Sequence, residues 1–222
     1  MNKLSKRLEV VASFIEDNSK VIDIGCDHGL LSIYLARKYP NIKIIASDIN
    51  KNALSSAINN IKEANLEDRI ETRLGSGLEV VTKEEIDTIV ISGMGSNTIV
   101  GILKYSKDKL VNVNNIIIQS NTDLYFLRKN ITSIGYYIED EVLVEDKGII
   151  YTVIKFIKGK KKYNYKELYL GPILLEKNDI LFQKKNEKEL MTLKMINKNI
   201  IRGHYLYRTK IKRNIKILEE IK

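Results

Sequence analysis

The residues best suited to chemistry lie in one short segment, residues 21–32, which reads VIDIGCDHGLLS. After a run of small apolar residues come Asp23, Gly25 and then Asp27 beside His28. A dinucleotide-binding loop reads Gly-x-Gly-x-x-Gly, because the pyrophosphate must touch the backbone. Asp27 stands in the place of the middle glycine, and its carboxylate would repel a pyrophosphate. The segment suits a cofactor with a cationic centre, such as the sulfonium and ammonium of S-adenosylmethionine.

A second acidic residue supports this interpretation. Asp48 ends the second predicted strand, 23 residues after Gly25, at about the spacing where a carboxylate binds the ribose hydroxyls of a nucleotide cofactor. We expect the next residue, Ile49, to contact the cofactor as well. Two further loops, Gly75-Ser76-Gly77 and Gly93-Met94-Gly95, follow later strands, where glycines let a ligand approach the backbone. One such loop could be a simple tight turn, but three at one sheet edge indicate a Rossmann-like methyltransferase.

An alternating α/β chain is needed to bring these loops together. Strand-like runs are predicted at residues 20–24, 42–47, 70–74, 86–91 and 115–119. Helices are predicted at 29–39, 51–65, 97–105 and 123–133, after a first helix that carries Leu4, Leu8, Val11 and Ile15. The alternation predicts a parallel sheet with helices on both faces. Two last strand-like runs, 136–145 and 149–157, flank Asp146-Lys147-Gly148, so we expect a terminal antiparallel hairpin.

Residues 158–222 differ from the rest of the chain. They carry 18 Lys and Arg against 7 Asp and Glu, a net charge of +11, whereas residues 1–157 have a net charge of −2. Gly171-Pro172 predicts a turn or a helix start. Apolar residues, with the polar Asn197 among them, then recur at helical steps on either side of Gly203, at Leu190, Leu193, Ile200, Tyr207, Ile211, Ile215 and Leu218. We expect a cofactor-binding domain over 1–157 and a basic, coiled-coil-like helical hairpin over 158–222.

Composition disfavours several classes of protein. No window holds eighteen uninterrupted apolar residues and the N-terminus lacks a signal-peptide stretch, so we expect no membrane span and a cytoplasmic location. The single cysteine, Cys26, excludes an internal disulfide framework. One cysteine and two distant histidines, His28 and His204, predict no metal site. The basic tail indicates a polyanionic partner, and a solvated lysine-rich helix is the alternative interpretation.

Beyond these features, the sequence resembles the bacterial tRNA methyltransferases that modify N1 of adenine 22. The resemblance runs from near the N-terminus to the start of the tail, and its most specific element is the Asp27-His28 pair. The matching segments are Leu4-Ser5-Lys6-Arg7-Leu8, residues 23–28, Gly75-Ser76-Gly77-Leu78-Glu79-Val80, Gly93-Met94-Gly95, Gln119-Ser120-Asn121, Glu139-Asp140-Glu141-Val142 and Gly171-Pro172. The resemblance implies a class I, Rossmann-like domain that binds S-adenosylmethionine, followed by a helical coiled-coil tail.

The resemblance also implies roles for individual residues. Cofactor contacts are expected from Arg7, Asp23, Gly25, Asp27, Asp48, Ile49, Ser76, Gly77, Gly93 and Met94. The residues expected beside the transferred methyl group or the target base are Asp27, His28, Met94 and Asn121, with Gln119 also facing the base. RNA phosphates are expected to contact Lys160, Lys161, Lys162, Arg202, Arg208, Lys212 and Arg213.

Three positions depart from the family pattern. Ser76 replaces an aspartate at the expected adenine site, which removes a charge there. Ser96 replaces the last glycine of the fourth-strand loop. Ser120 replaces a proline, and because proline fixes φ, its loss predicts a looser turn before Asn121.

Methylation of adenine N1 asks little of a general base. The neutral ring nitrogen has a free lone pair, so catalysis rests on positioning and on accommodating the charge that moves to the base. The N6 amino group becomes more acidic after transfer, and both Asp27 and Asn121 are candidates to accept its proton. His28 either orients Asp27, contacts the base or only shapes the loop.

The sequence therefore predicts an S-adenosylmethionine-dependent tRNA adenine-N1 methyltransferase. Its expected partner is tRNA, with no metal and no obligatory protein partner. One alternative is a methyltransferase that acts on another RNA or on a small molecule. A second alternative is a non-catalytic RNA-binding protein that keeps the cofactor-binding fold.

Overall fold

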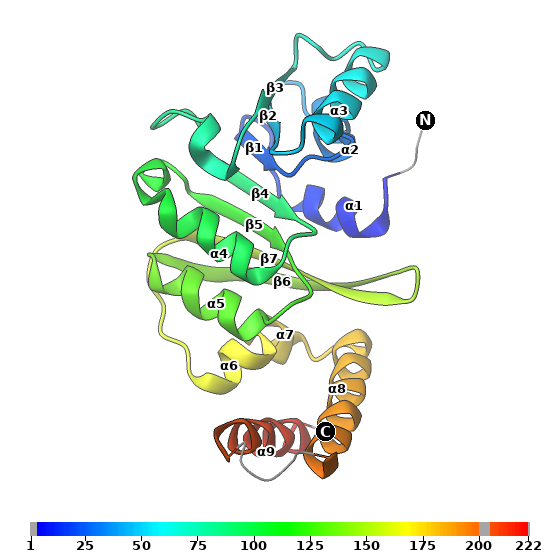
Figure 1. Ribbon diagram of the computed structural model, residues 1–222, viewed down its shortest axis with the longest axis vertical. Coiled ribbons are helices and arrows are strands. Elements are labelled where there is room, and N and C mark those ends of the chain that lie inside the picture. The colour runs from blue at the N-terminus through cyan, green and yellow to red at the C-terminus, as the bar shows by residue number, and fades with distance from the viewer. Residues whose placement is uncertain (1–3, 200–204, 222) are drawn as a thin grey trace.

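The computed structural model describes residues 4–199 and 205–221, in which an α/β layer carries a group of helices after its last strand (Figure 1). The parallel strands are β1 (Lys20–Ile24), β2 (Lys43–Asp48), β3 (Ile70–Leu74), β4 (Thr88–Ser92) and β5 (Asn115–Gln119). The helices between or before them are α1 (Lys6–Ser13), α2 (Leu30–Lys38), α3 (Lys51–Glu63), α4 (Ser96–Tyr105) and α5 (Leu124–Ser133). The predicted strands and helices are confirmed, and their ends agree within two residues.

The described strands form one seven-stranded sheet in the order β3-β2-β1-β4-β5-β7-β6. Strands β1 to β5 pair in parallel, and the hairpin of β6 (Tyr136–Asp146) and β7 (Ile149–Lys158) joins antiparallel beside β5. Its turn residues, Lys147 and Gly148, have φ of 50° and 78°, as a type I′ turn requires. The predicted antiparallel end of the sheet is therefore confirmed.

Alternate side chains of each central strand enter two separate cores. In β5, Ile116 and Ile118 pack with the cluster that includes residues of α4 and α5. Ile117 packs on the other face, with residues of α1, α2 and α3. Because each fully buried isoleucine contributes about 1.5–3 kcal/mol, this double burial holds the strand ends firmly. The short 3₁₀ helix η1 (Gly77–Val80) adds Leu78 to the first cluster.

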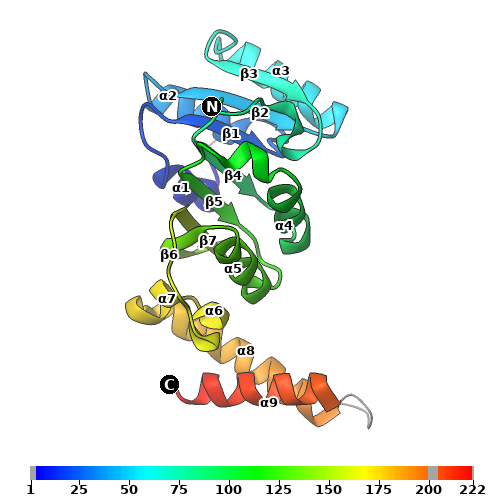
Figure 2. The ribbon, with the colours of Figure 1, turned by 90° about the vertical axis from the view of Figure 1, so that its left-hand side faces the viewer.

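The chain after the hairpin forms the helices α6 (Tyr165–Leu170), α7 (Pro172–Lys177), α8 (Ile180–Asn199) and α9 (Tyr205–Glu219). Pro172 is the first residue of α7, so of the two predicted alternatives, a turn or a helix start, Gly171-Pro172 is a helix start. Figure 2 shows α8 and α9 lying against each other at the end of the molecule farthest from β3. A third apolar cluster, with Leu174, Phe182, Leu190 and Leu218, also includes Leu143 of β6, so these helices share a core with the hairpin.

Some details of the predicted tail differ from the structure. The short helices α6 and α7 lack a clear periodic signal in the sequence, so α6 was not expected and only the start of α7 was indicated, by Gly171-Pro172. Tyr207, predicted on the apolar seam, is 51% exposed, and Asn186 and Asn214 are buried instead. Ile200, Arg202 and His204 lie outside the described residues. A helical hairpin is present, while its coiled-coil character stays a prediction. No helix among residues 4–199 and 205–221 is long and apolar enough to cross a membrane.

A buried ion pair joins the helices to the sheet. The Arg128 Nε of α5 donates to Glu141 Oε1 of β6 at 2.7 Å, and both side chains are fully buried. Arg128 Nη1 also donates to the carbonyls of Leu168 and Tyr169 in α6, each at 3.0 Å. At Gly171, φ is 98° and a Cβ would lie 2.5 Å from Glu141 Oε2. Only glycine fits both conditions, so this position couples α6 and α7 to the ion pair.

Candidate cofactor and target-base site

The predicted loops all emerge at the carboxyl edge of the parallel strands. Register pairs Ile24 of β1 with Ser47 of β2 and with Ile91 of β4. It also pairs Ser92 of β4 with Gln119 of β5. The segments that follow β1, β2, β4 and β5 therefore stand side by side, on the right-hand side of the sheet in Figure 1. This edge is where open α/β sheets bind their ligands.

The backbone of the first loop adopts left-handed conformations that glycine favours. Gly25 N and Cys26 N both donate to the Ser47 carbonyl, at 2.8 and 3.0 Å. Asp27 has φ of 51° and Gly29 has φ of 68°. Asp27 thus keeps the left-handed backbone of the glycine it replaces, which Asp and Asn tolerate better than other side chains. The loop thus carries a carboxylate on a left-handed backbone.

Asp48 is held as an oriented acceptor. Its Oδ2 accepts from Asp27 N at 3.1 Å, and its Oδ1 accepts from Asn50 N at 2.8 Å. Each oxygen keeps a further lone pair for a ligand. The two apolar side chains beside it, Ile49 and Leu74, are 73% and 53% exposed at the ends of β2 and β3. Carboxylate and exposed aliphatic side chains together match a ribose with an attached aromatic base.

Asp23 is the most perturbed acid of this edge. Burial raises the pKa of its carboxyl to about 6, the Ser32 hydroxyl lowers it, and nearby Asp48 raises it further. The Ser32 hydroxyl donates to Asp23 Oδ2 at 2.8 Å. A buried carboxylate beside a second one favours a cation in its neighbourhood. This position therefore suits the cationic part of a ligand.

The Asp27-His28 pair points into solvent at the top of the loop. His28 Nε2 lies 3.7 Å from Asp27 Oδ2, and the two side chains are 57% and 70% exposed. The His28 carbonyl accepts from Asn60 Nδ2 at 2.8 Å, which ties the loop to α3. Both side chains are free to meet an incoming base. The contact is loose enough that His28 can orient Asp27 without holding it rigidly.

The loops after β1 and β4 touch each other. A Cβ at Gly25 would lie 2.3 Å from Met94 Cε, so the methionine occupies the space that a side chain would need. Gly25 and Gly93 have φ of 74° and 86°. Gly93 N donates to the Gln119 carbonyl at 3.1 Å, which brings the end of β5 into the same group. Met94 therefore sits between the predicted cofactor loop and the predicted base-facing segment.

Gln119 corrects one expectation. It was expected to face the target base, but it is only 2% exposed and its amide joins two other site residues. Its Oε1 accepts from Arg7 Nη1 at 2.6 Å, and its Nε2 donates to Asn121 Oδ1 at 3.3 Å. Arg7 also lies 5.3 Å from the ring centre of Tyr151. Arg7 thus sets the orientation of Asn121 through Gln119, and its expected cofactor contact stays a prediction.

Two of the departures from the family pattern meet in space. Ser96 Oγ and Ser120 Oγ are 3.3 Å apart and buried. Thr122 extends the group, since its N–H donates to Ser120 Oγ at 3.4 Å and its Oγ1 accepts from Ser96 N at 2.9 Å. These hydrogen bonds span the turn that carries Asn121. The turn expected to be loose without proline is therefore tied to the start of α4.

The remaining predicted site residues fall in several places. Ser76 is exposed and Gly77, with φ of 52°, is buried against Ile102, so both follow β3 at the same edge. Residues 160–162 are exposed at the other edge, because Lys158 N donates to the Asn114 carbonyl just before β5 begins. On α9, Arg208 and Lys212 are exposed, and the exposed Arg213 stacks 3.4 Å above the Tyr165 ring.

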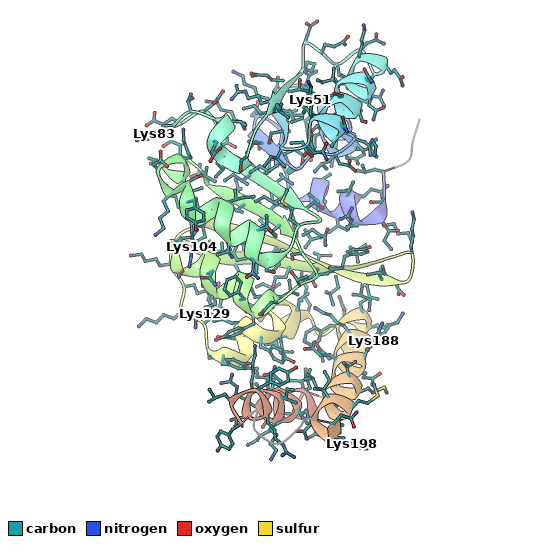
Figure 3. The ribbon with its side chains drawn as sticks, in the orientation of Figure 1. Lys51, Lys83, Lys104, Lys129, Lys188 and Lys198 are labelled. Carbon is teal, nitrogen blue, oxygen red and sulfur yellow. The ribbon has the colours of Figure 1, made fainter. Side chains whose placement is uncertain are left out.

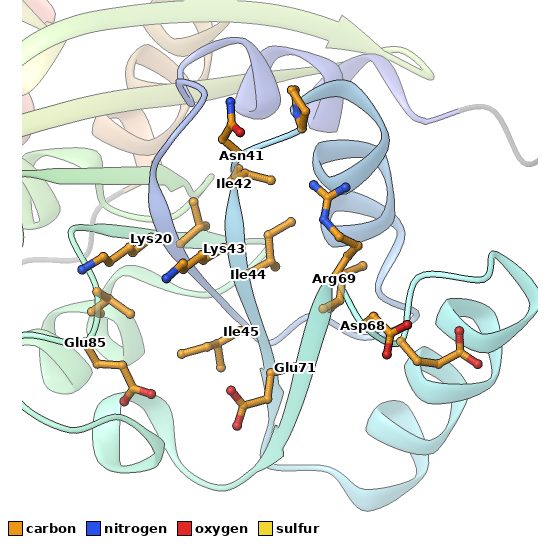
Figure 4. A pocket seen from close by; sticks show the side chains of 15 residues that line it. Lys20, Asn41, Ile42, Lys43, Ile44, Ile45, Asp68, Arg69, Glu71 and Glu85 are labelled. Atoms are coloured by element: carbon orange, nitrogen blue, oxygen red, sulfur yellow. The ribbon is translucent and has the colours of Figure 1, made fainter.

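A separate hollow lies far from these loops. Figure 4 shows it between Lys20, Lys43 and Glu71, at the beginnings of β1, β2 and β3. Its volume is about 570 Å³, and acidic and basic side chains of the strands and loops line it together. Because it opens at the amino ends of the strands, it does not belong to the candidate site. Among the residues that the structure describes, no group of His, Cys, Asp or Glu could hold a metal ion.

Comparison with known proteins shows which proteins the chain is similar to. A Bacillus subtilis tRNA (adenine(22)-N(1))-methyltransferase is 34% identical over 204 residues, covering 89% of this chain and 86% of its own. A Streptococcus pneumoniae structure in complex with S-adenosyl-L-methionine has a TM-score of 0.90, 29% identity and 99% coverage of both chains. M. capricolum TrmK, solved in complex with S-adenosyl-homocysteine, has a TM-score of 0.84 and 30% identity, and the alignment covers 98% of this chain and 96% of that one.

The family profile itself spans nearly the whole chain. Residues 21–221 match the family described as tRNA (adenine(22)-N(1))-methyltransferase. The match includes the loops after β1, β2, β3, β4 and β5 as well as the C-terminal helices. The chain belongs to the tRNA (adenine(22)-N(1))-methyltransferase family.

Proposed function

We propose that this protein transfers a methyl group from S-adenosylmethionine to N1 of adenine 22 in tRNA. The observation that carries the proposal is the joint placement of Asp27, Asp48, Met94 and Asn121 on one sheet edge, within loops that contact one another. Family membership supplies the substrate class. A non-catalytic RNA-binding role would not need an exposed carboxylate in a left-handed loop position.

The described residues fit the cofactor. Asp48 presents lone pairs fixed by two backbone N–H groups, which suits the ribose hydroxyls. Ile49 and Leu74 expose aliphatic surface that suits the adenine ring. Asp23 and Asp27 supply negative charge for the ammonium and sulfonium. When bound, S-adenosylmethionine supplies an electrophilic methyl group.

The protein side of the reaction is mainly positioning. Adenine N1 already has a lone pair, so the site must hold the ring in line and stabilise the positive charge that develops on it. Asn121 is exposed and its Oδ1 accepts from Gln119 Nε2, so we assign its Nδ2 to the incoming base. Asp27 carries the exposed carboxylate of the site. We therefore assign acceptance of the N6 proton to Asp27 and orientation of the base to Asn121.

The proposed function implies tRNA as the partner and different roles for two parts of the chain. Residues 1–157 would hold cofactor and base, while residues 158–222 would bind the tRNA. The latter part keeps most of the excess positive charge. A tRNA substrate and a single buried cysteine suit the cytoplasm. No protein partner is required by the proposed reaction.

Two measurements test the function. Purified protein, labelled cofactor and an unmodified tRNA transcript should give methyl transfer that disappears when adenine 22 is replaced by guanine. Asp48→Asn should weaken cofactor binding about 10- to 100-fold in calorimetry, because it removes a charged hydrogen-bond acceptor. The matched control, Asp68→Asn, changes the same charge at an exposed position and should leave affinity unchanged. Methylation that persists on the guanine transcript would refute the assignment of adenine 22.

A further inference from the structure

A groove of about 580 Å³ begins at the target-base segment and runs along α8. Asn121 and Leu124 line one end, and the hairpin residues Gly148, Ile149 and Ile150 line one side. The opposite side is formed by α8 residues, namely Lys184, Lys185, Glu187, Lys188 and Met191. Register explains the adjacency, because Gln119, which ends β5, pairs with Val153 in β7, next to the groove residue Thr152.

The charges of this groove are unequally satisfied. Lys184 Nζ is paired with both carboxylate oxygens of Glu145 at 2.9 Å. By contrast, no carboxylate among residues 4–199 and 205–221 forms an ion pair with Lys185 or Lys188. Glu187 supplies the acidic side chain of the groove wall. Two ammonium groups are therefore left for an anionic ligand.

Lys185 is held in position before any ligand arrives. Its Nζ donates to Thr152 Oγ1 of β7 at 3.1 Å, and Thr152 is buried. Burial, and then the charge of Arg128, lower the pKa of Lys185 to about 8. An ammonium that has lost most of its water gains more from a phosphate than a solvated one does, since screening is weaker there. Its preset position also reduces the entropy lost on binding.

We propose that this groove binds the sugar–phosphate backbone of the nucleotides adjoining the target adenine, with Lys185 and Lys188 as phosphate contacts. The inference rests on the proposed function, which supplies RNA as the polyanion. A nucleotide turned toward Asn121 carries its own flanking phosphates to within the length of this groove. Exposed Ile149 and Met191, at 50% and 67% exposure, offer apolar surface to the riboses. Phosphate contacts here set the register of the adenine without reading sequence.

The proposal is tested by Lys185→Met and Lys188→Met, alone and together, with Lys198→Met as the matched control. Lys198 lies on the same helix and loses the same charge, but Figure 3 places it toward the far end of α8 from Lys188. Each groove variant should raise the Kd for tRNA about eightfold at 0.1 M salt and lower the salt slope by about one. Methionine replaces a desolvated lysine of similar volume, and unchanged cofactor affinity in calorimetry verifies the fold.

Single phosphates beside adenine 22 can be replaced by methylphosphonate in a tRNA ligated from synthetic halves. Loss of that charge should weaken binding of the tRNA to the unaltered protein and to the Lys198→Met variant. It should not weaken binding to the double variant Lys185→Met/Lys188→Met. An equal loss of tRNA affinity in all three proteins would overturn the groove assignment. Methylation of adenine 22 by the unaltered protein would still support the proposed function in that case. Failure of the unaltered protein to bind or methylate tRNA would overturn both.

Discussion

The loops at the carboxyl edge and the helices after the hairpin are stabilised in different ways. Backbone groups organise the loops, as when Gly25 N donates to Ser47 or Asp27 N donates to Asp48. Buried side chains organise the helices, through the Arg128–Glu141 ion pair and the apolar cluster of the hairpin. Loop substitutions should therefore change chemistry at little cost in stability. Substitutions at the buried ion pair should change stability first.

The same contrast separates two basic regions. Residues 160–162 are exposed near the amino ends of the strands, while Lys185 and Lys188 line a groove that reaches Asn121. Sequence charge alone treats these lysines alike. Their positions make the α8 lysines the closer candidates for phosphates beside the target base, and RNA contact by residues 160–162 stays a prediction. Removing everything after residue 160 would uncover Leu143 and Arg128, so truncation is a poor test of RNA binding.

The largest expected effect breaks the ion pair that holds the helices. Arg128→Met leaves Glu141 buried without its partner and should lower the free energy of unfolding by about 3–5 kcal/mol. Urea denaturation measures the change. Arg128→Met/Glu141→Leu removes both charges and should recover most of the loss. Lys194→Met, at the exposed pair with Glu219, is the control and should cost about 1 kcal/mol or less.

The next effect concerns the buried acid of the loop region. Because the pKa of Asp23 is about 6 when folded and 3.8 in its ordinary state, the folded protein binds the extra proton between these values. Its contribution to stability is fully present below pH 3.8 and is lost as pH rises through 6, about 3 kcal/mol in all. Asp23→Asn should remove this dependence from urea unfolding measured between pH 4 and 7. The assignment would be contradicted if the unfolding free energies of the two proteins had the same dependence on pH.

A substitution in the exposed loop should separate chemistry from stability. Asp27→Asn keeps a residue that tolerates a φ of 51° but removes the carboxylate, so single-turnover methylation should fall about 100-fold. The rate is measured at saturating cofactor, because Asp27 also supplies charge to the proposed cofactor site, and the unfolding free energy should change little. Asp68→Asn again serves as the charge-matched control. A full single-turnover rate in Asp27→Asn would show that Asp27 only shapes the loop.

The smallest expected effect tests the hydroxyl contact between the loops. Ser96→Ala and Ser120→Ala, with the double variant, should give a coupling energy of about 0.5–1 kcal/mol in unfolding. Each single variant should also lower turnover, because the turn before Asn121 loses part of its support. Additive effects on stability would mean that the two serines act independently. Ser55→Ala, on the exposed face of α3, controls for the loss of a hydroxyl.

The fold could be predicted because its signals are local. Runs of β-branched residues such as those of β5 favour strands, and alternation with helices leaves few topologies. The position of Asp48 at the end of β2 was predictable for the same reason, because a strand end can be read from the sequence and all parallel strands end at one edge. The short helices α6 and α7 could not be predicted from hydrophobic periodicity, because each has too few residues to show a helical period.

Long-range pairing was decided only by the tertiary structure. Nothing in the neighbourhood of Gln119 indicates that Arg7 would bury its amide, or that Ser96 would meet Ser120. Lysines of residues 160–162 and of α8 look equivalent in sequence, yet the antiparallel return of β7 sends them to opposite edges of the sheet. The local sequence determined the strands, the chemistry of the loops and the basic character of residues 158–222. Which side chains share a site depended on register and packing, since these bring together residues more than a hundred positions apart.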